Sequence, residues 1–171
     1  MKKYEFTGET KEIKLLFRTA VLHRIRATVS FGFVKIGDLG GWIEKEENLS
    51  HEGKAWVWGN AEVCGDAKVW GNAEVWGNAE VWGNAEVFSA SHVLVIGAIG
   101  SRNDFTTFYR DKDNEITVKC GCFLGKIDRF LEKVTQTHGD SKYALVYRAA
   151  VEVAKLQIDL SGEAPKDADE E

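Results

Sequence analysis

A six-residue phrase dominates the middle of this chain. It reads Val-Trp-Gly-Asn-Ala-Glu at 57, 69, 75 and 81, and Val-Cys-Gly-Asp-Ala-Lys at 63. A period this short is typical of a parallel β-helix, in which each hexad supplies one short strand and the corner after it. Three hexads per turn would place residues eighteen apart on top of one another. The repeat therefore predicts a scaffold and says little about chemistry.

Each position of the hexad has a predicted role. The first residue, usually Val, and the fifth, Ala, point inward and form the core. Gly and Asn in the third and fourth positions suit a corner, because both tolerate a positive φ. The second and sixth positions, mostly Trp and Glu, are left to point outward.

The segments on either side of the repeat have other patterns. Apolar and polar residues alternate from Val21 to Phe33, which indicates a half-buried strand. Strands are expected at 106–110 and 116–123, followed by two amphipathic helices that form a hairpin on either side of Gly139. We expect four parts: an N-terminal β cap (1–36), the β-helix (37–99), a C-terminal α+β domain (100–160) and an acidic disordered tail (161–171).

Composition narrows the function. The net charge is -5, so the chain has no basic field to attract nucleic acid. The sequence has neither a run of eighteen apolar residues nor a signal-peptide pattern, which predicts a cytoplasmic protein without a membrane partner. Its three cysteines (Cys64, Cys120 and Cys122) are expected to be free thiols.

The hexads, with Val first and Ala fifth, resemble the left-handed β-helix of the hexapeptide-repeat superfamily, best known from trimeric acyltransferases. The lead-in Gly-Asp-Leu-Gly-Gly-Trp at 37–42 looks like a transferase-like branch found in bacteria and their phages. Ile99–Asp104 and Cys120–Phe123 resemble a domain appended in phage and prophage relatives. The resemblance implies a mainly β fold built on a short left-handed parallel β-helix, frequent trimers, and acyl-CoA as a possible ligand.

The outward aromatic residues suggest an interface. An eighteen-residue offset stacks Trp58 under Trp76 and Trp70 under Phe88, and it places Cys64 under Trp82. So many exposed aromatic rings on a small prism predict covered surfaces, supplied by other subunits or by the flanking domains. A platform on which a ligand stacks is the alternative.

The sixth hexad position stacks charged groups. Lys68 lies under Glu86 as an attractive pair, whereas Glu62 lies under Glu80. The two like charges of this second pair need a cation, a Lys or Arg side chain of a neighbouring subunit, or hydration. Glu74 lies under His92. If the carboxylate orients the imidazole, His92 becomes a candidate general base.

Two further groups of residues are candidate ligand sites. A donor-rich loop, with Arg110 near it, could bind a phosphate or nucleotide through backbone amides and a guanidinium; its residues are Gly100, Ser101, Arg102 and Asn103. A connecting turn explains the same residues. Cys120, Cys122 and His138 offer three zinc ligands, but alternating strand residues explain them equally, so no metal is predicted.

Taken together, these patterns favour a non-catalytic homotrimer that binds a host protein or a small anionic ligand as a phage or prophage accessory protein, without a cofactor. The alternative is an acyl-CoA-dependent acyltransferase that uses His92 as the base and Glu74 as its orienting group.

Overall fold

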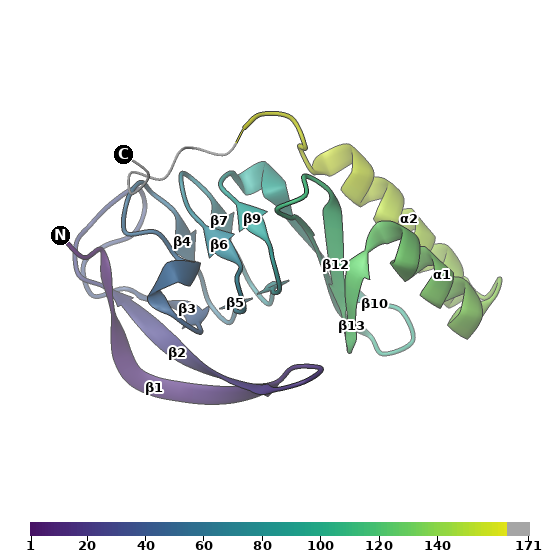
Figure 1. Cartoon of the computed structure of the whole chain (residues 1–171), viewed down its shortest axis with the longest axis horizontal. Helices are drawn as coiled ribbons and strands as arrows, with labels where there is room; N and C mark the ends of the chain where they lie inside the picture. The colour runs from purple at the N-terminus through teal and green to yellow at the C-terminus, as the bar shows by residue number, and fades with distance from the viewer. Residues whose placement is uncertain (164–171) are drawn as a thin grey trace.

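The computed structural model describes residues 1–163 (Figure 1). Over this range thirteen strands form one mixed sheet of five strands, one antiparallel sheet of four strands and two sheets of two parallel strands. The strands are β1 (Tyr4–Lys14), β2 (Thr19–Ala27), β3 (Leu39–Ile43), β4 (Trp56–Val57), β5 (Glu62–Val63), β6 (Lys68–Val69), β7 (Glu74–Val75), β8 (Glu80–Val81), β9 (Glu86–Val87), β10 (Val93–Ile99), β11 (Asp104–Arg110), β12 (Ile116–Cys120) and β13 (Phe123–Lys126). The α-helices are α1 (Ile127–His138) and α2 (Lys142–Gln157).

The hexads stack in the register that the eighteen-residue offset predicts. Each hexad forms a two-residue strand, and β4, β5 and β6 pair in parallel with β7, β8 and β9. Val57 lies beside Val75, Val63 beside Val81. The Val and Ala side chains are fully buried, and the glycines after each strand have positive φ, as the corners require. We refer to residues 56–88 as the stacked hexads.

The prediction that the fold is a short left-handed β-helix is wrong. The short parallel strands are divided among three small sheets, and the largest of these is continued by antiparallel strands, in the order β1-β2-β3-β5-β8. The C-terminal sheet, β10-β11-β12-β13, is antiparallel throughout. Only two residues of each hexad lie in a strand, so the longer antiparallel strands outside the repeat provide most of the sheet structure.

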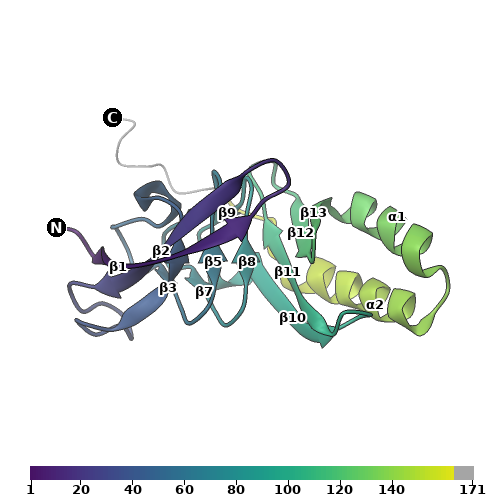
Figure 2. The ribbon, with the colours of Figure 1, turned by 90° about the horizontal axis from the view of Figure 1, so that it is seen from below.

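The N-terminal residues close one end of the stacked hexads. Tyr4 is buried against His51, with ring centroids 4.2 Å apart. The Lys3 ammonium donates to the carbonyl of Ala55 at 2.8 Å. The hairpin of β1 and β2 then runs along the side of the hexads (Figure 2).

The C-terminal sheet closes the other end. The Tyr109 hydroxyl donates to the carbonyl of Trp82 at 2.6 Å, and the amide of Glu80 donates to the Thr107 hydroxyl at 3.0 Å. These contacts come from the sheet face opposite the helices, which cover the other face (Figures 1 and 2). The sheet is therefore a layer between the hexads and the helix pair.

Both expected helices are present, and they bury the expected faces. Gly139 ends α1 with a φ of 57°, and Ser141 precedes α2 as its N-cap residue. The apolar residues that face the sheet include Phe130, Val134 and Val151. Neither these helices nor the shorter helical turns within residues 1–163 could span a bilayer. Most of the expected disordered tail, residues 164–171, lies outside the described range.

Candidate functional site

The aromatic ladders form in the predicted register. Trp58 stacks on Trp76 with centroids 4.5 Å apart and planes 5° apart, and Trp70 stacks on Phe88 at 5.4 Å. Their exposure differs, however. Trp76 is 52 % exposed, whereas Trp70 is only 9 % exposed. The ladders therefore do not form one continuous apolar surface.

The chain itself covers Trp82, which is 8 % exposed. Its indole packs with Leu22 of β2 and with Cys64, and the ammonium of Lys119 lies 4.1 Å from the indole centroid. The sequence left open whether another subunit or a flanking segment covers this position. The β1–β2 hairpin and β12 do so, which removes Trp82 from the predicted subunit interface.

The carboxylates of Glu62 and Glu80 lie in adjacent strands, as predicted. Each has a cation from its own chain. The Lys11 Nζ lies 2.7 Å from Oε1 of Glu62, and the Lys119 Nζ lies 3.0 Å from Oε2 of Glu80. The like-charge pair therefore needs neither a metal nor a second subunit. Lys68 pairs in register with Glu86, also as predicted.

The structure does not bring His92 and Glu74 together as a catalytic pair. His92 is 2 % exposed, and its Nδ1 accepts the backbone N–H of Phe88 at 3.2 Å. The Glu74 carboxylate accepts instead from the indole N–H of Trp76. Burial lowers the pKa of His92, and the Arg110 guanidinium lowers it further. The Asp159 carboxylate acts in the opposite direction and raises this pKa. Because no carboxylate within residues 1–163 is hydrogen-bonded to the buried ring, His92 has the contacts of a structural side chain at the end of the hexads.

Arg110 lies at the opposite end of β11 from the predicted anion-binding loop. Its guanidinium donates to the carbonyls of Ser161 and Gly162, at 3.0 and 2.7 Å, and lies over the ring of Phe88. Six strand residues separate it from residues 100–103, about 20 Å along the strand. The predicted set of ligand donors is thus split, because the hairpin places its turn and its open end on opposite sides.

The loop itself packs against α2 and the β12–β13 turn. A Cβ on Gly100 would clash with the Tyr147 hydroxyl, and one on Gly121 would clash with the Arg102 guanidinium. Burial raises the pKa of Tyr147, with a further contribution from the Cys120 thiol. The Thr106 hydroxyl donates to the Cys120 sulfur at 3.4 Å. These contacts support the connecting-turn interpretation of Gly100, Ser101, Arg102 and Asn103.

The same region contains the cysteines and the histidine that were considered as zinc ligands. His138 stacks on Tyr147 with centroids 5.7 Å apart, and Cys122 is exposed in the β12–β13 turn. Throughout the described chain, no three His, Cys, Asp or Glu side chains are placed to hold a metal ion.

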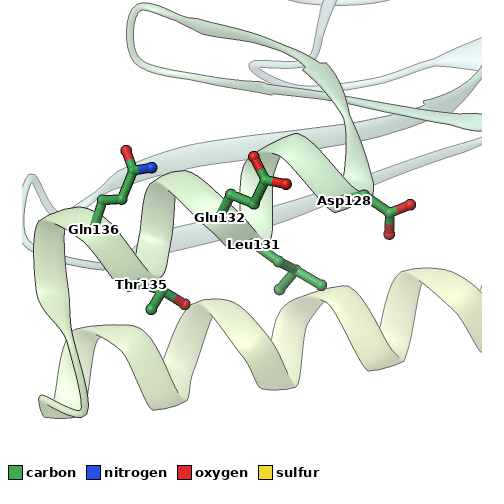
Figure 3. Close-up of a pocket in the computed structure, with 5 residues that line it drawn as sticks. All are labelled: Asp128, Leu131, Glu132, Thr135 and Gln136. Carbon is green, nitrogen blue, oxygen red and sulfur yellow. The ribbon is translucent and has the colours of Figure 1, made fainter.

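Sequence reasoning missed a hollow on the outer side of α1 (Figure 3). It has a volume of about 440 Å³ and is lined by Asp128, Leu131, Glu132, Thr135 and Gln136. Leu131 and Thr135 point toward α2, whereas the Glu132 and Gln136 side chains point away from it. Only one of the five lining side chains, Leu131, is apolar, so the hollow by itself does not define a ligand.

A row of apolar residues lies on the face of α2 that is turned away from the C-terminal sheet. Leu145 is 60 % exposed, Val153 is 47 % exposed and Leu156 is 89 % exposed. With the exposed Ala149, these residues follow helical spacing along one side. We call Leu145, Ala149, Val153 and Leu156 the outer row. The signal was present in the sequence, because α2 has apolar residues on two faces and only one can face the sheet.

Comparison with known proteins adds no relative: no protein-family model matches the chain, and no curated protein matches it. The resemblance to the hexapeptide-repeat superfamily stays a prediction.

Proposed function

We propose that this protein is a non-catalytic binding protein, and that its partner-binding surface is the outer face of the helix pair. The observation that carries the proposal is the exposure of Leu145, Val153 and Leu156 along one side of α2. The partner is a protein that presents an apolar surface of its own.

The energetic reason is the apolar area that the outer row leaves in water. Burial of such area is worth roughly 25 cal/mol per Å², so three large aliphatic side chains on one face can drive association. Single exposed aliphatic residues are common on protein surfaces, but a contiguous row marks an interaction site more often.

The stacked hexads and His92, the other candidate sites, give little support for an enzymatic function. The interior of the stacked hexads is filled by buried Val and Ala side chains. His92 is buried with both ring nitrogens next to donors of the same chain. An acyltransferase would need a base that a substrate can reach, so the enzymatic alternative is the weaker one.

A double variant of the outer row and a control at a distant exposed residue test the proposal. Leu145→Glu combined with Leu156→Glu places two charges on the outer row, whereas Leu16→Glu places one on the equally exposed tip of the β1–β2 hairpin. We expect a partner that co-purifies with the wild type to be lost from the double variant, at least tenfold, and kept by Leu16→Glu. Retention of every partner by a folded double variant would refute the proposal.

A further inference from the structure

We infer that the partner of the outer row is a second copy of this chain, with the two α2 helices packed antiparallel in a twofold dimer. This inference rests on the proposed function, and it identifies the protein that covers the outer row. Dimers with twofold symmetry are the commonest protein assemblies, and their interface must be complementary to itself.

The spacing of the outer row meets that requirement. When two copies of α2 run antiparallel, Leu145 of one copy lies opposite Leu156 of the other. Ala149 of one copy then lies opposite Val153 of the other. Each contact occurs twice, which gives four apolar layers in succession along the helix pair.

The sizes of the side chains also suit close packing. The two large leucines are at the ends of the row, and the smallest residue, Ala149, lies near the middle. Small residues at the centre allow two helices to approach each other, while the larger ends fill the space where crossing helices diverge.

Charges at the ends of the row favour the antiparallel arrangement. Lys142 begins α2, and Asp159 follows it; both side chains are exposed. Antiparallel packing places Lys142 of each copy near Asp159 of the other, whereas parallel packing would place like charges together.

The mass of the protein in solution tests the inference. We expect sedimentation equilibrium at micromolar to submillimolar concentrations to approach twice the 19.1 kDa of one chain. Leu156→Glu should shift the equilibrium to the single chain, with at least a tenfold weaker association, and the matched control Leu16→Glu should behave as the wild type. A wild type that keeps the mass of one chain over this range overturns the inference, as does an equal effect of the two variants.

Cysteine pairs test the orientation. In a Cys122→Ser background, copies with Leu145→Cys and copies with Leu156→Cys should form a disulfide with each other under a mild oxidant such as molecular oxygen, which accepts the two electrons. Each variant alone should form at least severalfold less. Preferential pairing of each variant with itself would show that the helices are not antiparallel.

Failure of this inference can be told apart from failure of the proposed function. If the wild type remains a single chain but a different protein co-purifies and depends on Leu145 and Leu156, the binding surface stands and only its occupant is wrong. If neither the mass nor any co-purifying protein responds to these substitutions, both proposals fall.

Discussion

Lys3 shows how a single residue closes one end of the fold at an electrostatic cost. Its side chain is 2 % exposed, and its ammonium donates to the carbonyls of Ala55 and Glu52. Burial lowers the pKa of Lys3 from 10.5 to about 8. The folded chain therefore releases this proton at a lower pH than the unfolded chain does.

This difference in pKa predicts a pH-dependent stability. Between pH 8 and about 10.5 the unfolded state binds more protons at Lys3, so this residue's contribution to the free energy of unfolding rises with pH. We expect the wild type to gain on the order of 1–2 kcal/mol relative to Lys3→Met across this window. Urea unfolding of both proteins at pH 7.5, 9 and 10 measures the gain. The control is Lys2→Met, because Lys2 is exposed, and a constant difference between wild type and Lys3→Met would contradict the prediction.

Residues of the repeat were the most predictable part of the molecule. The sequence places Val and Ala inside and predicts that residues eighteen apart stack, and the structure confirms both, from Val57 beside Val75 to Trp58 on Trp76. The partners of the outward residues were not predictable in the same way. Lys119 and Leu22 reach Trp82 from strands distant in sequence, and hexad periodicity carries no information about which distant segment covers a given face.

At the scale of elements, β3 approaches the hexads so closely that it requires glycine. A Cβ on Gly40 would lie 2.7 Å from the Trp56 ring and 2.8 Å from the carbonyl oxygen of Val57. We expect Gly40→Ala to destabilise the fold by roughly 2–3 kcal/mol, because neither a buried indole nor a backbone group can move away easily.

Substitution of a second glycine, Gly77, measures the cost of the backbone conformation without the cost of steric crowding. Gly77 has a φ of 63°, and the methyl group of an alanine at this position would have no atom within 4 Å. Gly77→Ala should therefore destabilise the fold by only about 1 kcal/mol, because a residue with a Cβ disfavours the left-handed conformation. Thermal unfolding of both variants should rank Gly40→Ala as the less stable; the reverse order would show that β3 does not pack as described.

The helices illustrate what periodicity can and cannot predict. Their buried faces follow from the spacing of residues such as Phe130 and Val151. The outer row was overlooked because a second apolar face on one helix has no partner within its own sequence pattern. The overall architecture was also mispredicted. The period of the repeat predicts how the hexads stack on one another, but it does not predict the pairing of the longer antiparallel strands that flank them.

At the scale of the whole molecule, the C-terminal sheet joins the hexads to the helix pair. The Tyr109 hydroxyl, buried at this junction, donates to the Trp82 carbonyl. Tyr109→Phe leaves that carbonyl without its donor, and we expect it to lower the free energy of unfolding by about 1–3 kcal/mol. Tyr143→Phe, at an exposed position on α2, is the control and should change stability by less than about 0.5 kcal/mol. Equal effects of the two changes would mean that the junction contributes little.

A photo-cross-linking amino acid, incorporated in living cells, tests the claim that the outer face of the helix pair is the partner-binding surface. Placed at Leu156, it should give a discrete covalent adduct with a bound protein, either a second copy or another partner. Placed at Leu16, it should give none. Adducts from Leu16 and none from Leu156 would contradict the account.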